Sequence, residues 1–260
     1  MGVMACAAVE AADDLELVAR IGRGDGVSGG DDGARVAREA LAAGAQVAVE
    51  LSAPRGAPER VAALVGAGVH VVVGTTGWDE ASLSVLRSTL ESAPAGTGVL
   101  VAPSFAVGAV LMMRFAALAA PFFESVEIVE THHPDKVDAP SGTAAATASA
   151  VAAARRAAGV PPAPDATTTA LPGARGASVD GVAVHSVRLR GMTASQEVLL
   201  GGKGEVLTVR HDATDRSAFM PGVLLGVRGV AGHPGLTVGL ERYLRLGAGL
   251  GADLDAGSDV

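Results

Sequence analysis

One short stretch of the chain gathers side chains that could do chemistry together. Two adjacent histidines, His132 and His133, are followed by Lys136, and Ser141-Gly142-Thr143 opens an alanine-rich run typical of a helix. The first N–H groups of a helix attract anions, and a glycine there lets a ligand approach the backbone. An ammonium and two imidazoles would add positive charge and deliver protons near neutral pH. The stretch therefore predicts a site for a small dianion that must be protonated.

Each of these features also has a simpler interpretation, and metal binding is a rival one. Histidines in loops and single lysines are commonly solvated, and a serine before a helix is commonly an N-cap. Neighbouring side chains of an extended loop point in opposite directions, so the histidine pair is a poor start for a metal site. Glu130, Asp135 and Asp138 do not supply the spacing of a known zinc motif. We expect no metal.

The first hundred residues alternate between strand and helix patterns, which favours a doubly wound parallel sheet of the Rossmann type. After an opening helix, we expect strands over 15–21, 46–52, 69–76 and 98–104, with helices over 34–43, 58–67 and 79–92. Ligands of such sheets bind outside the carboxyl ends of the strands. Those ends are GTTGW (74–78) and APSF (102–105).

After residue 105 the pattern changes to that of a smaller α+β domain with a mixed sheet. We expect helices over 107–120 and 143–157, a strand over 125–130, and an antiparallel meander of 183–191, 195–202 and 205–213. The predicted domains are 1–105, completed by a helix within 217–246, and 106–216. The small, acidic residues after 247 predict a disordered tail.

Composition excludes several classes of function. The 20 basic and 28 acidic residues give a net charge of −8, and the aromatic residues are only five Phe, one Trp and one Tyr. An acidic chain with few stacking side chains is a poor nucleic-acid binder. The single cysteine, Cys6, cannot form an internal disulfide. Without a basic leader or an uninterrupted apolar span, we expect a cytoplasmic protein that does not bind membranes.

A resemblance to a known family rests on five runs in the same order. These are VVVGTTGW (71–78), APSFAVGAVLM (102–112), ETHHPDKVDAPSGTA (130–144), SVRLRG (186–191) and RHDATDRSAF (210–219). The chain resembles the dihydrodipicolinate reductases, also called 4-hydroxy-tetrahydrodipicolinate reductases, from Gly2 to about residue 245. The third run is the most specific of the five.

The resemblance implies an oxidoreductase of the diaminopimelate route to lysine. It would transfer hydride from a nicotinamide cofactor to a cyclic dicarboxylate, with loss of water, to give tetrahydrodipicolinate. The residue matching His132 would act as acid/base and the one matching Lys136 as proton donor, while His133, Ser141, Gly142 and Thr143 would hold the substrate. The family fold is a dinucleotide-binding domain and a mixed-sheet domain that closes on it and assembles a homotetramer.

The resemblance also assigns the cofactor contacts. Gly74, Thr75 and Thr76 match the nicotinamide-side loop, and Ala102, Pro103, Ser104 and Phe105 match a run that usually has Asn in place of Ser104. Family members begin with a strand and a G-x-x-G-x-x-G turn around the pyrophosphate, and Gly2 matches the last of these glycines. The first strand is therefore expected to be missing, and we expect an upstream extension to improve cofactor binding.

Cofactor choice is expected at the end of the second strand of such a domain, where an acid selects NAD and a base NADP. The run ARIGRGD (19–25) has Gly22 at that place with Arg20 and Arg23 beside it, which favours NADPH over NADH. Two other functions stay open. One is a non-catalytic, N-terminally truncated homologue that keeps only the dicarboxylate site. The other is a semialdehyde dehydrogenase, which would need a nucleophilic cysteine in the second domain.

Overall fold

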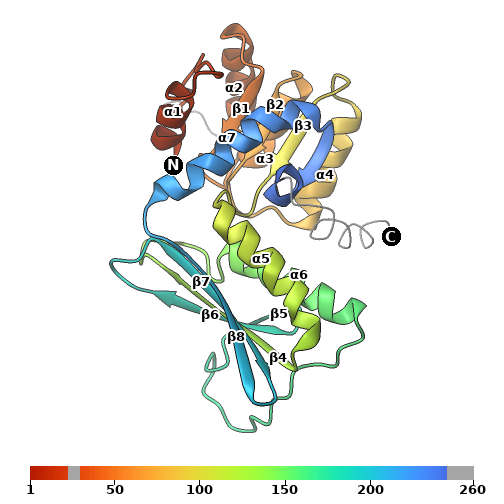
Figure 1. Cartoon of the computed structure of the whole chain (residues 1–260). Coiled ribbons are helices and arrows are strands. Elements are labelled where there is room, and N and C mark those ends of the chain that lie inside the picture. Colours follow the sequence, from red (N-terminus) through yellow and green to blue (C-terminus); the bar gives the residue numbers. More distant parts are fainter. Residues whose placement is uncertain (23–29, 245–260) are drawn as a thin grey trace. The chain divides into compact units, whose positions relative to one another are not determined.

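Two compact units make up the chain. The computed structural model describes residues 1–22 and 30–244, so the Arg23 prediction and the predicted tail after 247 lie outside the described residues. Unit 1 combines Met1–Phe105 with Phe219–Val260, and unit 2 is Ala106–Ala218. Each unit has its own sheet (Figure 1).

Unit 1 is built around a parallel sheet with strand order β1-β2-β3-β9. The strands are β1 (Val47–Glu50), β2 (His70–Val73), β3 (Gly98–Val101) and β9 (Gly235–Val238). Its helices are α1 (Gly2–Glu10), α2 (Gly30–Ala42), α3 (Ala57–Gly66), α4 (Glu80–Glu91) and α7 (Met220–Gly229), with short 3₁₀ turns η3 (Val230–Gly232) and η4 (Leu240–Tyr243). The predicted parallel, helix-covered sheet is confirmed.

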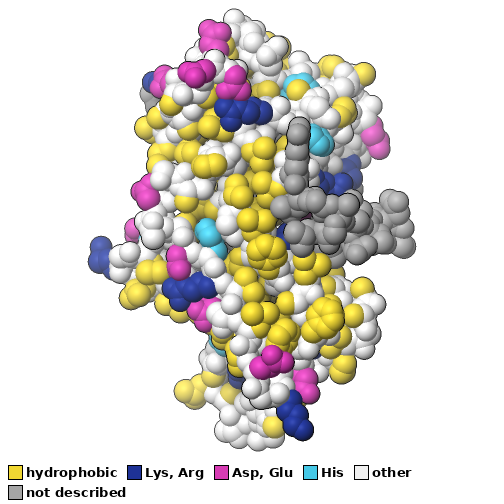
Figure 2. All heavy atoms as spheres, in the orientation of Figure 1, with side chains coloured by type: hydrophobic (Ala, Val, Ile, Leu, Met, Phe, Trp, Pro, Cys, Tyr) yellow, Lys and Arg dark blue, Asp and Glu magenta, His cyan; other side chains and the backbone are white. Residues whose placement is uncertain are grey.

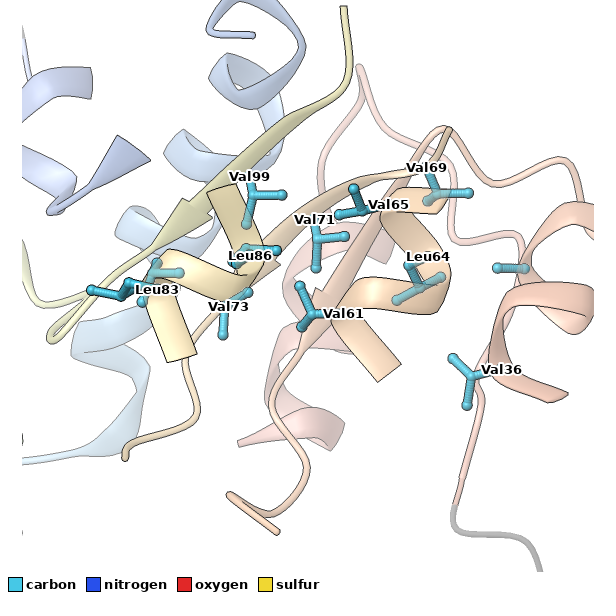
Figure 3. Packing of buried hydrophobic residues seen from close by; sticks show 12 residues of the cluster. Val36, Val61, Leu64, Val65, Val69, Val71, Val73, Leu83, Leu86 and Val99 are labelled. Carbon is cyan, nitrogen blue, oxygen red and sulfur yellow. The ribbon is translucent and has the colours of Figure 1, made fainter. Parts of the chain in front are cut away.

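Helices cover both faces of this sheet, as the uniformly apolar strands predict. Figure 3 shows side chains of α3 and α4, among them Val61, Leu64 and Leu86, packed with Val71 and Val99 of the sheet. On the opposite face, a Cβ at Gly226 of α7 would lie within 2.9 Å of the Leu100 side chain. The absence of a side chain at this glycine therefore lets α7 approach the sheet.

The strand predicted over 15–21 is wrong. Its odd-numbered residues are half-buried and its even-numbered residues are exposed, so the period-2 pattern is present. Among the described residues, however, no strand ladder includes this segment, and the sheet ends at β1. A strand needs a neighbour for its backbone N–H and C=O groups. The side-chain pattern alone could not show that this partner is lacking.

The helix expected within 217–246 is α7, but it ends at Gly229 and the chain returns as strand β9, which was not predicted. Pro234 lacks the N–H that a helix needs, and Gly235 has a φ of +85°. Leu236 and Thr237 then pair with Val99 and Leu100 of β3. The sequence His233-Pro234-Gly235 was the signal that a turn separates α7 from β9.

Unit 2 has a mixed sheet with strand order β5-β6-β4-β7-β8. The strands are β4 (Ser125–His132), β5 (Ala177–Val179), β6 (Val182–Arg188), β7 (Ala194–Gly202) and β8 (Glu205–Ala213). The helices are α5 (Val107–Ala119) and α6 (Gly142–Ala157), with 3₁₀ turns η1 (Ala120–Phe122) and η2 (Arg216–Phe219), the last at the junction with unit 1. The predicted mixed-sheet fold is confirmed.

The predicted three-stranded meander is only half right. β7 and β8 form an antiparallel hairpin, but β6 pairs with β4, parallel to it, and with β5, which was not predicted. Strand β4 therefore lies between β6 and β7. Alternation of side chains predicts the strands but not which of two apolar neighbours a strand selects.

One face of this sheet packs on helices and the other is open. Val126 and Ile128 of β4 join α6 residues such as Ala148 and Val151 in an apolar core.

The outer side of α5 carries the exposed Phe115 and Leu118, and Figure 2 shows hydrophobic side chains gathered over this helix. Within the two described ranges, no helix is long and apolar enough to cross a membrane.

Candidate functional site

Strand β4 places the predicted chemistry at its carboxyl end. Its side chains alternate, so Val126, Ile128 and Glu130 are buried on the helix-covered side. His132 follows two residues after Glu130 and therefore lies on the same side of the strand. On this side of β4, the acidic Glu130 therefore follows the apolar Val126 and Ile128 and directly precedes His132.

Glu130 is fully buried and is bound by four groups. Its Oε2 lies 2.5 Å from Nδ1 of His132 and accepts from Arg188 at 3.0 Å. Its Oε1 accepts from Arg188 at 3.0 Å and from the backbone N–H of Ser141 at 3.2 Å. Burial raises the pKa of Glu130, but the hydrogen bonds from His132, Arg188 and Ser186 outweigh it and lower the pKa to about 2. The carboxylate is ionised at neutral pH.

Lys136 is held by the loop that follows the strand. Its backbone N–H donates to the carbonyl of His133 at 3.2 Å, and its Nζ donates to Oδ1 of Asp138 at 2.6 Å. Burial opposes ionisation of Asp138, but the hydrogen bond from Lys136 outweighs it and holds the pKa of that carboxyl below its usual range. The ammonium is therefore paired with an acid of its own loop.

The N-terminus of α6 completes the cluster. The Ser141 hydroxyl is its N-cap and accepts from the Ala144 N–H at 3.2 Å, so it serves the helix directly. Gly142 and Thr143 form the first turn, and both are half-buried. Arg188 ties this region to the loop, because its Nη2 also donates to the Asp138 carbonyl at 2.6 Å.

The structure of unit 2 thus brings most of the sequence-predicted residues into one network. Glu130 connects His132, Arg188 and Ser141, while Asp138 connects Arg188 with Lys136. The predicted anion-binding elements, namely a helix N-terminus and basic side chains, therefore occur together. Such a cluster can bind a carboxylate and exchange a proton with it or with an attached ring.

In unit 1 the two predicted loops meet at the carboxyl ends of β2 and β3. Gly74 donates its N–H to the Glu50 carbonyl, and a Cβ at this position would lie 2.5 Å from the Phe105 ring. The Ala102 N–H donates to the Val73 carbonyl at 3.0 Å. Phe105 therefore closes against a position where only glycine fits.

The other predicted cofactor residues take different positions in unit 1. Thr75 is buried and accepts a 3.2 Å hydrogen bond from the Trp78 indole, whereas Thr76 is exposed. Ser104 is buried and Pro103 is half-buried. Gly2 begins α1, which packs against α7, and a Cβ added at Gly2 would meet nothing within 4 Å.

Sequence reasoning missed the roles of Glu130, Arg188 and Asp138. A carboxylate on the buried side of an apolar strand requires a partner, and this was the available signal for Glu130. Arg188 comes from a strand 58 positions further along the chain, and no spacing rule connects it with Glu130.

Two other expectations concern metal and cysteine chemistry. Among the described residues, no group of three or more His, Cys, Asp or Glu side chains could hold a metal ion. Cys6 is half-buried on α1, which belongs to unit 1, whereas a semialdehyde dehydrogenase would need its cysteine in the second domain.

Comparison with known proteins agrees with the motifs. The family described as "Dihydrodipicolinate reductase, N-terminus" matches residues 1–105, and "Dihydrodipicolinate reductase, C-terminus" matches residues 108–244. The chain is 59% identical over 247 residues to a 4-hydroxy-tetrahydrodipicolinate reductase of Streptomyces coelicolor, covering 95% of this chain and 94% of the relative. It is 56% identical over 246 residues to one of Nocardia farcinica, covering 95% of each.

A solved structure is also similar. A dipicolinate-bound dihydrodipicolinate reductase from Paenisporosarcina sp. TG-14 matches with a TM-score of 0.74 and 35% identity, covering 94% of this chain and 95% of that one. Nothing in these comparisons supports the truncated, non-catalytic alternative, since both family domains match. The resemblance in the motifs is confirmed: the chain belongs to the dihydrodipicolinate reductase family.

Proposed function

We propose that this protein is an NAD(P)H-dependent reductase that converts 4-hydroxy-tetrahydrodipicolinate to tetrahydrodipicolinate. The observation that carries the proposal is the network of unit 2, in which His132, Lys136 and the α6 N-terminus lie around two anchoring carboxylates. The relatives carry the name of this reaction, and the similar solved structure holds dipicolinate, a related dicarboxylate ring.

Substrate binding uses the positive end of α6. One carboxylate of the substrate accepts hydrogen bonds from the N–H groups of Gly142 and Thr143, where the helix dipole adds to the attraction. Lys136 and His133 supply further positive charge or donors. Because Lys136 pairs with Asp138 in the structure, substrate binding exchanges one carboxylate partner of the ammonium for another.

Proton delivery falls to His132 and Lys136. When the substrate ring accepts hydride, negative charge develops on it, and a nearby acid must neutralise that charge. Nδ1 of His132 is engaged by Glu130, so Nε2 is the ring nitrogen that can give or take a proton. Lys136 is the second proton donor.

The cofactor residues fit a nicotinamide dinucleotide. Gly74, Thr75 and Thr76 after β2 and Ala102 to Phe105 after β3 form the carboxyl-end loops where such sheets bind ligands, and the close contact of Gly74 with Phe105 fixes their shape. Bound there, the dinucleotide supplies hydride. Gly2, at the start of α1, would supply a backbone N–H for the pyrophosphate.

NADPH is the proposed preferred cofactor. Arg20 and Arg23 lie beside Gly22 in the sequence and supply the basic groups for this preference, whereas Arg35 of α2, which donates to the Gly22 carbonyl at 3.0 Å, is already paired with Asp32 and Glu39. Guanidinium groups pair well with a 2′-phosphate. The ratio of kcat/KM for NADPH to that for NADH tests this preference, and a higher kcat/KM with NADH would reject it.

Assembly and location complete the proposal. We propose a cytoplasmic homotetramer in which unit 2 supplies both the substrate site and the subunit contacts. The open face of its sheet carries Val206 and Val187, which are 68% and 40% exposed. Light scattering of purified protein measures the oligomeric state, and Val206→Lys should weaken the assembly.

The deciding experiment follows nicotinamide absorbance with enzymatically generated substrate. His132→Ala and Lys136→Ala should each lower turnover by roughly 100-fold, because each removes a proton donor, while circular dichroism remains unchanged. If either variant keeps turnover near that of the unmodified protein, the role proposed for the residue it replaces is wrong. An unmodified protein without turnover would reject the proposed reaction.

A further inference from the structure

A polar row crosses the helix-covered face of the sheet in unit 2. Glu130 of β4 pairs in register with Ser186 of β6 and Gln196 of β7, and Gln196 pairs with His211 of β8. The rows below it are apolar, for example Ile128 with Val198 and Val184. Burying polar side chains at the carboxyl end of β4 costs desolvation energy, so this row requires an explanation.

Glu130 is the only carboxylate of this row, and hydrogen-bond partners hold both of its oxygens. Arg188 holds both oxygens, the Ser141 N–H holds Oε1, and His132 Nδ1 approaches Oε2 at 2.5 Å. An ionised carboxylate can only accept, so Nδ1 of His132 carries the hydrogen of this contact. Of the two ring nitrogens, Nε2 is then left for other partners.

We propose that Glu130 and Arg188 are positioning residues for His132. Glu130 fixes the ring orientation and tautomer and stabilises the imidazolium that His132 forms, and Arg188 keeps Glu130 ionised and in place. The inference rests on the proposed function, since it assigns a role within that reaction. Carboxylates that orient a histidine through Nδ1 perform the same task in other catalytic sites.

Other charged groups near this pair are few and are already engaged. On the loop, Lys136 and Asp138 pair with each other, and Arg188 reaches the Asp138 carbonyl. From α6, Thr147 accepts from the Gln196 amide at 2.7 Å. On β8, burial lowers the pKa of His211 and so favours its neutral form. Glu130 is therefore the anion with a direct contact to the His132 ring.

The first test replaces Glu130 with Gln, which keeps the shape but removes the charge. We expect kcat to fall roughly 10- to 100-fold, KM for the dicarboxylate to change less than threefold, and the alkaline limb of the kcat–pH profile to move to lower pH. Glu127→Gln is the matched control: Glu127 lies on the same strand, binds a histidine and an arginine, and faces the other side of the sheet. It should leave kcat and the pH profile unchanged.

Arg188→Lys keeps a positive charge but loses the two-pronged contact. It should lower kcat less than Glu130→Gln does, with the same direction of change in the pH profile. If Glu130→Gln shows wild-type kcat and an unmoved alkaline limb, the positioning role is rejected. A loss of stability without a shift of the limb would likewise assign Glu130 a purely structural role.

A second measurement needs neither turnover nor a folded Glu130 variant. In histidine-labelled unmodified protein, NMR should show the His132 ring protonated at Nδ1, with a deshielded, slowly exchanging proton, and His132→Gln assigns the signal. A His132 ring protonated at Nε2 alone, or without a protected Nδ1 proton, would overturn the inference. Absence of reductase activity in the unmodified protein would instead reject the proposed function and leave this contact to be judged by NMR.

Discussion

Two basic side chains of the candidate site are each held by a carboxylate of the same chain. Glu130 binds His132, and Asp138 binds Lys136. The two acids differ in environment, because Glu130 is fully buried while the Asp138 side chain is 30% exposed. We therefore expect Glu130 to stay hydrogen-bonded to His132 when the substrate binds, whereas Asp138 competes with the substrate for Lys136.

The competition predicts the effect of Asp138→Asn. The Asp138 carboxylate accepts from the Lys136 ammonium and from the Gly142 N–H at the start of α6, and a neutral amide would bind both less strongly, so a bound dicarboxylate meets less competition. Dipicolinate should bind about 2- to 5-fold more tightly, which corresponds to the free energy of one partly exposed ion pair. Isothermal titration calorimetry measures this change. Weaker binding would mean that Asp138 orients Lys136 for the substrate instead of competing with it.

Local sequence patterns predicted the elements that carry the site better than the contacts between them. The N-cap at Ser141 and the helix after it follow from residue types within a few positions, and the apolar alternation of β4 identifies its buried side. By contrast, the contact of Arg188 with Glu130 depends on β6 lying parallel to β4, which is a choice among distant strands. The strand predicted over 15–21 was wrong for the same reason, because a strand forms only where a neighbouring strand pairs with its backbone N–H and C=O groups.

The cap of α6 predicts a local effect of Ser141→Ala. Losing the hydrogen bond to the Ala144 N–H should cost about 1 kcal/mol of unfolding free energy and loosen the turn that holds a carboxylate. Dipicolinate binding should weaken with it. Asp79→Ala is the control, because Asp79 caps α4 in unit 1 and should cost stability without changing dicarboxylate affinity. Equal affinity of the Ser141 variant and the unmodified protein would contradict this role of the cap.

The loop after β2 predicts a penalty for Gly74→Ala. The added Cβ would lie 2.5 Å from the Phe105 ring and 2.6 Å from the Leu51 side chain, so this loop or the loop after β3 must move. We expect a loss of about 1–3 kcal/mol in unfolding free energy and weaker dinucleotide binding. Gly66→Ala, where a Cβ meets nothing within 4 Å, is the control and should not destabilise the fold. Thermal unfolding and fluorescence titration with NADPH measure the two effects.

At the scale of the whole molecule, the change in the hydrophobic pattern near residue 105 indicated two folding units. Contacts within the chain place the boundary between these units between Phe105 and Ala106. Unit 2 contains both acids of the dicarboxylate network. Among its carboxyls, Glu130 combines full burial with a pKa lowered to about 2 from an ordinary 4.5. The stability of this unit should therefore depend on pH in the acidic range.

The sign of this dependence follows from proton linkage. The pKa of Glu130 is lower in the folded state than in the unfolded chain, so its stabilising contribution is complete above about pH 4.5 and is lost as the pH falls toward 2. The contribution is at most about 3 kcal/mol, from the size of the pKa difference. Urea unfolding between pH 7 and pH 2.5 should show the unmodified protein losing its advantage over Glu130→Gln as the pH falls. Glu127→Gln, on the open face, should show a smaller change, because Glu127 is partly exposed and solvent screens its ion pairs. A constant difference between the unmodified protein and Glu130→Gln across this range would show that the buried charge does not control the acid stability of the fold.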